Sequence, residues 1–332
     1  MNCFLTGANG FIGLRLAERL SAGGHVVRCL VRSPEKFNAL SHLPGVTAHV
    51  GDLDDIDILT RGVRGCDTVF HLAAFAKPWS KDKSLPYRVN VTGTENLLKA
   101  SLAAGVKRFV FTSSAAVIGP SPGEDPIDES FPRSVPYFNE YEETKAAAED
   151  LVRSYNRDGL ETVIVNPPRV YGPGPVNESN SLTRMIKLYQ KGRWRILPGD
   201  GTCIGCYVLV DDVVNGHLLA ALKGIPGNRY ILGGENLTFL QFFGTLAEVT
   251  GKRRLLIPFP VWMMSAIATV MEWQAALTGW PPLITAAWVK KYLNHWSLSS
   301  NKAIRELGYS ITPLREGAKI TLDWLREEGE LR

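Results

Sequence analysis

The sequence predicts an α/β protein with a doubly wound parallel sheet and a smaller, mostly C-terminal lobe. Over the first 170 residues short apolar runs alternate with helical patterns, an order typical of parallel strands joined by right-handed helical crossovers. Runs such as Phe109-Val110-Phe111 have no polar face, which indicates strands covered on both sides of the sheet. The chain of 332 residues is 45% hydrophobic and 21% charged, a composition that excludes a disordered or collagen-like protein.

The elements follow one another in a regular order. Six runs are predicted strands, at residues 3–5, 25–31, 46–50, 68–71, 109–112 and 162–165, and helical patterns lie between them at residues 11–22, 34–40, 56–61, 85–104 and 141–156. After about Pro167 the alternation stops, and Gly172-Pro173-Gly174-Pro175 predicts a junction. We therefore expect a first domain over residues 1–168 and a second lobe over residues 169–332. Residues 206–222 are expected to return to the first domain as one more strand and helix.

Charge and cysteine content exclude several classes of protein. The net charge is +4 and no basic run is longer than residues 252–254, so nothing indicates binding of nucleic acid. Cys203 and Cys206 form a single C-x-x-C pair without a second pair or suitably spaced histidines, and we expect no metal site. Met1 leads directly into an apolar run without a basic leader, so the expected location is the cytoplasm.

Residues 255–289 form an unusual segment whose only charged residue is Glu272. Prolines at both ends interrupt it, and its charge-free halves are too short to predict a transmembrane helix. One interpretation is the apolar wall of a substrate lobe or a subunit interface. The other is peripheral contact with a membrane, because tryptophan favours that depth and two lysines follow. Five of the eight tryptophans lie in or just beyond the segment: Trp262, Trp273, Trp280, Trp288 and Trp296.

A glycine turn joins the first predicted strand to the first predicted helix. Its spacing is G-x-x-G-x-x-G, within residues 6–13. Glycines there permit a tight turn and close approach of a pyrophosphate, and the helix N-terminus supplies free N–H groups for the anion. We therefore expect a dinucleotide cofactor bound by Gly7, Asn9, Gly10, Phe11, Ile12 and Gly13.

The end of the second strand distinguishes between the two nicotinamide cofactors. NAD(H) would favour a carboxylate there for the ribose hydroxyls, but this chain has Arg32, with Lys36 shortly after it. A guanidinium suits the 2′-phosphate of NADP(H), which is therefore the favoured cofactor, with NAD(H) as the alternative. After the third strand, Asp52, next to Leu53, either contacts the adenine amino group or acts as a helix N-cap or turn residue.

Tyr141 and Lys145 are four residues apart on a predicted helix, and therefore on one face. A nearby ammonium favours phenolate, which predicts that Lys145 lowers the pKa of Tyr141. A phenol adjusted in this way can exchange a proton with a carbonyl or alcohol oxygen. Ser113 and Ser114 follow the fifth strand, at the sheet edge where ligands bind, and a serine hydroxyl there can hold the reacting oxygen.

Together these features resemble the extended short-chain dehydrogenase/reductases over nearly the whole chain. The segments that carry the resemblance are residues 6–13, 71–74, 90–94, 112–115, 141–145, 169–174 and 210–213. The resemblance implies a Rossmann fold in which Tyr141 is the general acid/base, Lys145 also binds the nicotinamide ribose, and Ser114 orients the substrate oxygen. It further implies that the cofactor site includes Leu72, Ala73, Ala74, Thr112, Pro167, Pro168, Val170 and a structural asparagine, Asn90.

Within this family, Arg32 and the tail at residues 301–309 resemble the dihydroflavonol 4-reductase-like and 3β-hydroxysteroid dehydrogenase-like branch. Nucleotide-sugar epimerases share the tail, but other features depart from the sugar enzymes. Ser113-Ser114 stands where 4,6-dehydratases carry Asp-Glu. Gly205 stands where the nucleotide-sugar enzymes usually have a diphosphate-binding arginine, and Ile118 where they often have tyrosine.

The resemblance therefore implies an NADPH-dependent reductase that interconverts a ketone or aldehyde and an alcohol on a largely apolar small molecule. An alternative is an NAD-dependent nucleotide-sugar epimerase, in which Arg193 or Arg195 replaces the missing arginine. A second alternative is a non-catalytic nucleotide-sensing protein, which the intact Tyr141 and Lys145 disfavour. The resemblance also allows a homodimer through the helices at residues 85–104 and 141–156.

Overall fold

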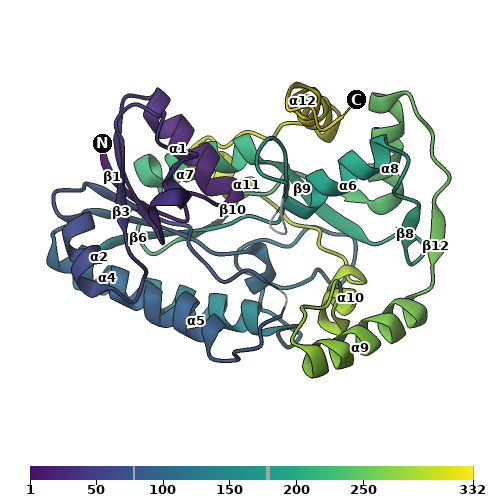
Figure 1. The fold of residues 1–332 in the computed structure, drawn as a ribbon, viewed down its shortest axis with the longest axis horizontal. Coiled ribbons are helices and arrows are strands. Elements are labelled where there is room, and N and C mark those ends of the chain that lie inside the picture. Colours follow the sequence, from purple (N-terminus) through teal and green to yellow (C-terminus); the bar gives the residue numbers. More distant parts are fainter. Residues whose placement is uncertain (78, 177–179, 332) are drawn as a thin grey trace.

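The computed structural model describes residues 1–77, 79–176 and 180–331 of the protein (Figure 1). Its centre is a sheet of seven parallel strands in the order β10-β6-β5-β4-β1-β2-β3. These strands are β1 (Asn2–Thr6), β2 (Val26–Val31), β3 (Val46–Val50), β4 (Thr68–His71), β5 (Arg108–Thr112), β6 (Glu161–Asn166) and β10 (Arg229–Ile231). All six predicted strands are therefore confirmed. The seventh is three residues long, too short for a recognisable apolar run.

Helices cover both faces of this sheet, as a doubly wound fold requires. The helices of both lobes, over the described residues, are α1 (Phe11–Ala22), α2 (Ile56–Val63), α3 (Leu85–Tyr87), α4 (Gly93–Ala103), α5 (Glu140–Tyr155), α6 (Ser181–Gln190), α7 (Val210–Lys223), α8 (Phe239–Thr250), α9 (Val261–Thr278), α10 (Ala286–Tyr292), α11 (Asn301–Leu307) and α12 (Leu314–Glu327). In Figure 1, α1, α7 and α11 lie on one face and α2, α4 and α5 on the other. Successive β1 residues point to opposite faces, so Leu5 and Phe4 lie in different cores.

Two predicted helices differ from the structure in detail. The pattern at residues 34–40 gives only a short 3₁₀ turn, Pro34–Phe37. The pattern at residues 85–104 is divided into α3, a π-helical turn at Arg88–Thr92, and α4. Single π-helical turns often occur at functional positions, and this one contains the buried Asn90.

The second lobe holds two smaller sheets. Their order is β11-β9-β7 and β12-β8, and their strands are β7 (Arg169–Tyr171), β8 (Ile196–Pro198), β9 (Ile204–Leu209), β11 (Glu235–Thr238) and β12 (Ile257–Phe259). The expectation that residues 206–222 return to the main sheet is correct only for the helix, because α7 packs against β5 and β6. The strand β9 pairs instead with β7 and β11, and β10 is the strand that returns to the main sheet.

Candidate active site

The glycine turn after β1 fits a pyrophosphate. Gly7 has a φ of +75°, and a Cβ there would lie 2.7 Å from the Ala73 backbone nitrogen. A Cβ on Gly13 would lie 2.0 Å from the Gly7 carbonyl oxygen. Helix α1 begins after Gly10 with no side chain capping it and no acidic residue in its first turn. Its N–H groups therefore point toward an uncovered position suited to an anion, which is what a dinucleotide requires.

A buried histidine, not singled out from the sequence, fixes this turn to the neighbouring strand. His71 Nδ1 is 2.7 Å from Thr6 Oγ1, and Nε2 is 2.8 Å from Thr94 Oγ1. The Thr94 hydroxyl donates to the Asn90 carbonyl, so His71 carries its proton on Nε2 and Thr6 donates to Nδ1. Burial lowers the pKa of His71 to about 3, which keeps the ring neutral. The Ala73 N–H donates to Thr6 Oγ1. A continuous series of hydrogen bonds therefore connects the end of β1 with residues 72–74.

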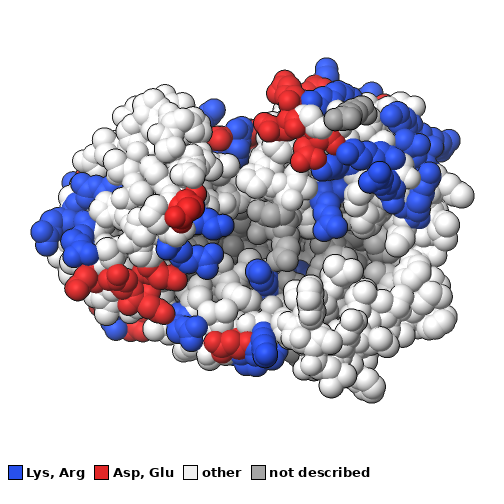
Figure 2. Space-filling view, viewed as in Figure 1, with Lys and Arg blue, Asp and Glu red and all other residues white. Residues whose placement is uncertain are grey.

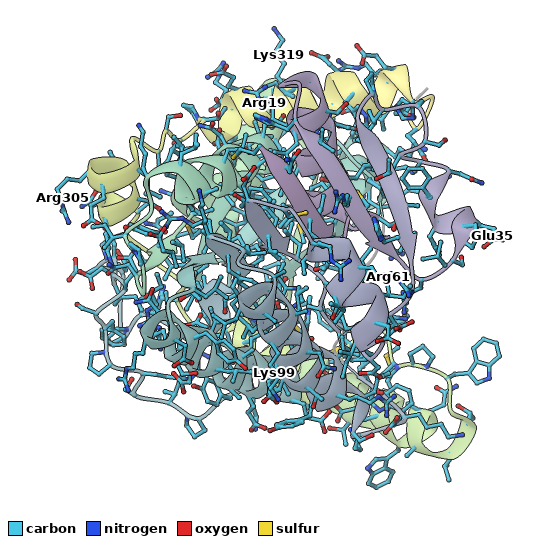
Figure 3. The ribbon with its side chains drawn as sticks, turned by 90° about the vertical axis from the view of Figure 1, so that its left-hand side faces the viewer. Arg19, Glu35, Arg61, Lys99, Arg305 and Lys319 are labelled. Carbon is cyan, nitrogen blue, oxygen red and sulfur yellow. The ribbon has the colours of Figure 1, made fainter. Side chains whose placement is uncertain are left out.

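The residues expected to select the cofactor lie beside the glycine turn. Arg32 directly follows β2 and is exposed, with no carboxylate at ion-pair distance in the described ranges. The Asn9 side chain donates to the Lys36 carbonyl, which holds the 3₁₀ turn against the glycine turn. Glu35 lies at the outer edge of that turn (Figure 3). Asp52 accepts from the Leu53 N–H at 2.8 Å, as a turn residue does, and the N-cap of α2 is Asp55 instead.

Ser114 and Tyr141 are brought together by β5 and α5. Tyr141 lies in the first turn of α5, which Asn139 caps by accepting from the Glu142 N–H at 3.0 Å. The nearby Ser114 hydroxyl lowers the pKa of the phenol, but burial outweighs this and raises the pKa of Tyr141 to about 12. The phenol is therefore protonated at neutral pH.

Lys145 lies on the same helix face but does not act as predicted. Its Nζ donates to the Thr112 carbonyl at 2.6 Å and lies 4.1 Å from the centroid of the Phe111 ring. Burial lowers the pKa of Lys145 to about 7. The prediction that its ammonium lowers the pKa of Tyr141 is therefore wrong for this structure. Desolvation dominates both groups, since it disfavours the phenolate and the ammonium alike.

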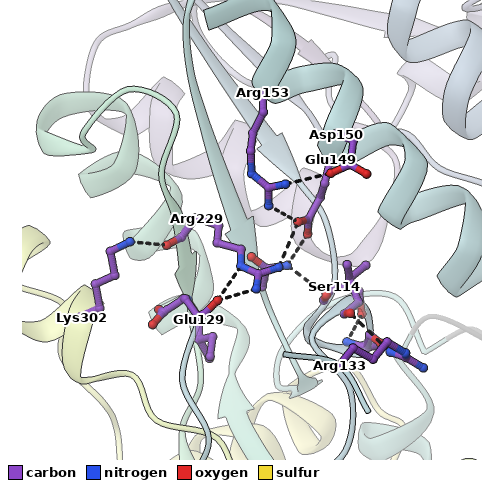
Figure 4. A network of polar contacts seen from close by, with 12 residues as sticks. Ser114, Glu129, Arg133, Glu149, Asp150, Arg153, Arg229 and Lys302 are labelled. Atoms are coloured by element: carbon purple, nitrogen blue, oxygen red, sulfur yellow. Dashed lines mark hydrogen bonds and ion pairs between the residues drawn. The ribbon is translucent and has the colours of Figure 1, made fainter. Parts of the chain in front are cut away.

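A buried polar network holds the backbone at Ser114 (Figure 4). The Asn166 side chain donates to the Ser114 carbonyl at 3.0 Å and to Glu149 Oε1 at 2.6 Å. Arg153 and Arg229 pair with the other oxygen of Glu149 at 3.0 and 3.5 Å. Because Glu149 follows Lys145 by one helical turn, the network fixes the end of β5 relative to α5.

Asn90 positions the loop that faces this site. Its amide donates to the Phe75 carbonyl at 3.2 Å and to Thr144 Oγ1 at 3.0 Å, and its oxygen accepts from the Phe75 N–H at 2.7 Å. These contacts link the loop after β4 to α5. They use both the amide and the oxygen of the Asn90 side chain, as expected of an asparagine with a structural role.

Two pockets flank the Ser114–Tyr141 pair. One adjoins Tyr141 and includes Phe75, Phe138 and Thr285. The other adjoins Ser114 and is lined by Ala115, Ala116, Pro168, Arg169, Val170, Ser181, Leu182, Cys206, Lys291, Tyr292 and Trp296. Figure 2 shows the molecule hollowed between its two lobes. Pro168 and Val170, predicted to bind the cofactor, line this pocket. Arg169, Lys291 and Tyr292 also line it and were not identified as site residues from the sequence.

Arg193 and Arg195 do not supply the missing arginine of the sugar enzymes. Both are exposed and neither lines a pocket that contains Ser114 or Tyr141. Arg169 comes closest to that position, because a Cβ on Gly205 would lie 2.3 Å from its Nη1 atom. The sequence offered one signal: Arg169 begins a segment that resembles the family.

The tryptophans in and just beyond residues 255–289 differ in exposure. Trp262, Trp273 and Trp280 are 70%, 72% and 76% exposed, and the surface over α9 is uncharged (Figure 2). Trp296, by contrast, is buried and lines the pocket at Ser114. The interpretation as a wall of the substrate pocket fits α9 only in part, because Glu272 lines the pocket at Tyr141 whereas Trp262 and Trp273 face solvent. None of the described helices is long and apolar enough to span a membrane.

Comparisons with known proteins agree with this arrangement. Residues 3–233 match the model of the NAD dependent epimerase/dehydratase family. A putative dihydroflavonol 4-reductase of Synechocystis sp. (strain ATCC 27184 / PCC 6803 / Kazusa) is 32% identical, over 99% of this chain and 96% of its own. A 4-hydroxy-2-methyl-3-oxo-4-farnesyl-3,4-dihydroquinoline-1-oxide ketoreductase of Stigmatella aurantiaca is 33% identical, over 99% and 97%.

A solved structure extends the likeness to the whole fold. The UDP-glucose 4-epimerase of Thermus thermophilus, in complex with NAD, is 28% identical and superimposes with a TM-score of 0.76. The match covers 98% of this chain and 99% of that one. The protein therefore belongs to the NAD-dependent epimerase/dehydratase family, the extended short-chain dehydrogenase/reductases, and is an NAD(P)-dependent oxidoreductase.

Proposed function

We propose that the protein is an NADPH-dependent reductase that interconverts a ketone or aldehyde and an alcohol on a largely apolar small molecule. The observation that carries this proposal is the protonated phenol of Tyr141 next to the Ser114 hydroxyl, between two pockets that both apolar and polar side chains line. The ketoreductase and dihydroflavonol reductase names of two relatives support the same reaction class. Consumption of NADPH by the purified protein with a panel of ketones and aldehydes tests it.

The hydroxyl groups of Ser114 and Tyr141 can position the carbonyl oxygen and protonate it. The Ser114 hydroxyl holds the carbonyl oxygen, and Tyr141, protonated at neutral pH, donates its proton to that oxygen. When bound, the reduced nicotinamide supplies the hydride. Lys145 donates one N–H to the Thr112 carbonyl, and its other N–H groups are available to a ribose hydroxyl.

Selection of NADPH is proposed to rest on Arg32, which is exposed and lies beside the glycine turn. One charge-assisted phosphate contact contributes about 1.5–3 kcal/mol, so NADPH should bind about 10- to 100-fold more tightly than NADH. Arg32→Ser should remove most of this preference by weakening NADPH alone. The measurement is titration of cofactor-free protein, following energy transfer from tryptophan to the reduced nicotinamide.

The control for this prediction is Arg19→Ser. Arg19 is an exposed arginine in the last turn of α1, away from the glycine turn, as Figure 3 shows. Its loss changes the net charge equally and should leave the preference intact. Equal or tighter binding of NADH by the parent protein would contradict the role of Arg32 and bring the NAD-dependent epimerase forward.

The epimerase remains a second candidate because an NAD-bound UDP-glucose 4-epimerase shares the fold at 28% identity. Such an enzyme oxidises and re-reduces its substrate on the same cofactor. NAD retained through purification, together with tight binding of a UDP-sugar, would favour it. Turnover of free carbonyl compounds with stoichiometric loss of NADPH would favour the reductase.

We further propose that α9 contacts a lipid surface. The carboxylate of Glu272, its only charged residue, accepts from the Ala286 N–H at 3.0 Å and leaves the outer face uncharged. Exposed tryptophans on an uncharged face fit the interface between lipid and water. Trp262→Ser/Trp273→Ser should lower binding to phosphatidylcholine vesicles by about 100-fold or more, since each of the two buried aromatic side chains contributes about 1.5–3 kcal/mol.

Vesicle co-sedimentation measures this effect. The control is Leu240→Ser, because Leu240 is also exposed but lies on α8 and not on α9. Equal binding by the parent and the double variant would overturn the membrane proposal. A dimer that dissociates in the double variant would assign the same face to a second copy of the chain.

A further inference from the structure

Arg169 is a cation held in the pocket by aromatic rings rather than by a carboxylate. Its Cζ lies 4.6 Å from the ring centroid of Tyr292, 5.3 Å from that of Phe239 and 5.6 Å from that of Tyr207. Among the described residues, the only hydrogen bond of its guanidinium goes to the Tyr207 hydroxyl, at 3.3 Å. No acidic side chain in the described part of the chain forms an ion pair with it. The rings stabilise a guanidinium without neutralising its charge.

The Glu142 carboxylate near the pocket is already paired with two other cations and does not neutralise Arg169. Lys291 Nζ is 3.1 Å from one Glu142 oxygen, and an Arg133 nitrogen is 2.9 Å from the other. Two cations thus share one carboxylate, and Arg169 adds a third positive charge. The region beside Ser114 therefore carries a surplus of positive charge, in contrast to Arg15, which pairs with two carboxylates.

The strand next to Arg169 is shaped for its guanidinium. Gly205 lies inside β9, and a Cβ there would come within 2.3 Å of Arg169 Nη1 and 2.9 Å of the Tyr207 ring. Glycine inside a strand is unfavourable by itself, so its presence indicates close approach of another group. Here that group is the guanidinium, which occupies the volume that a side chain at position 205 would fill.

We propose that Arg169 binds an anionic group of the substrate, a carboxylate or a phosphate carried by an otherwise apolar carbonyl compound. The inference rests on the proposed reductase function, because it places the reacting carbonyl at Ser114 in the same pocket. A guanidinium has five N–H donors and Arg169 uses one of them, so enough remain for a two-point contact with an anion. Pro168, Val170, Leu182 and Trp296 supply the apolar walls.

The first test compares charged and uncharged forms of one substrate. A homologous series of keto carboxylates and their methyl esters is reduced with NADPH, and kcat/KM is measured for each pair. The parent protein should prefer the acid, and Arg169→Met should reduce this preference by about 10- to 100-fold, the effect of losing charge-assisted hydrogen bonds. Arg169→Lys should restore part of it. Arg193→Met, which removes an exposed arginine away from the pocket, should keep it.

A second variant keeps the arginine and moves it. Gly205→Ala places a methyl group where the guanidinium now lies, and should weaken the preference for the acid in the same direction as Arg169→Met. If Arg169→Met does not fold, this variant still decides the matter. A parent protein that reduces acid and ester equally, or a preference that survives both substitutions, would overturn the anion site.

Binding without turnover separates this inference from the proposed function. Calorimetry of the NADP⁺-saturated protein with alkanoates, alkyl phosphates, alkanamides and UDP should detect the anions only when Arg169 is present. Anion binding that needs Arg169, without reduction of any carbonyl, would retain the site and reject the reductase. Reduction of neutral carbonyls, with no anion bound, would do the reverse. UDP bound far more tightly than the alkyl anions would identify the anion as a nucleotide diphosphate.

Discussion

Tyr141→Phe is expected to lower kcat for carbonyl reduction by about 10²- to 10⁴-fold, the usual contribution of a positioned general acid. The phenol is protonated because burial raises its pKa to about 12, and the Ser114 hydroxyl lies next to it. Phenylalanine keeps the ring in place and removes the proton that the carbonyl oxygen receives. The measurement is kcat at saturating NADPH with the best substrate of the panel, together with the dissociation constant for NADPH.

Tyr137→Phe is the matched control for this substitution. Tyr137 lies just before α5, and its ring stacks against Arg133, whose Cζ is 4.3 Å from the centroid. It lines neither pocket at the Ser114–Tyr141 pair, so its hydroxyl can be removed with kcat near the parent value. Parent-level turnover by Tyr141→Phe would refute the proposed mechanism. Loss of NADPH binding by that variant would show instead that the substitution disturbs the fold of the site.

Gly13→Ala is expected to abolish tight cofactor binding. The added methyl group would lie 2.0 Å from the Gly7 carbonyl oxygen, and both groups belong to the backbone of the turn. A gain of about 1 kcal/mol in helix propensity does not offset such overpacking. The turn must shift, and loss of two charge-assisted contacts to the pyrophosphate, at about 1.5–3 kcal/mol each, weakens NADPH binding by at least about 100-fold.

Gly244→Ala isolates the effect of position from the effect of residue type. Gly244 is also a helical glycine, in α8, but nothing lies within 4 Å of a Cβ placed there. Here alanine should stabilise the protein by about 1 kcal/mol and leave NADPH binding unchanged. Thermal unfolding and the same fluorescence titration measure both variants. If Gly13→Ala binds NADPH as the parent does, the pyrophosphate does not lie at this turn.

The strands and crossover helices of the main sheet could be predicted because their evidence is local. Each buried strand is a short apolar run, and each crossover helix has an apolar stripe, so β1 to β6 and α1, α2 and α5 were predictable within a few residues. The second lobe has strands of three to six residues with no such alternation. The strand β9 pairs with β7 and β11, each separated from it in the chain by a helix and a strand. Such pairing depends on the packed neighbours and cannot be inferred from the composition of β9 itself.

The site shows the same division. Tyr141, Lys145 and the glycine turn were predicted by spacing, because residues four apart on a helix share a face and glycines mark a turn. Ser114 was predicted by the family resemblance. The pKa values of Tyr141 and Lys145 could not be derived in this way. They depend on burial, which belongs to the packed protein and reverses the direction expected for Tyr141 from the charge alone.

The sequence by itself determined the class of fold and the family, and it predicted the cofactor turn and the proton-transfer residues, since all of these depend on periodicity and short spacings. Only the tertiary structure decided that Arg169 occupies the space beside Gly205 and that Trp262 and Trp273 of α9 face solvent. It also decided which tryptophan lines the pocket. The physical reason is that exposure, desolvation and charge balance are set by neighbours distant in the chain, and no local pattern records which neighbours those are.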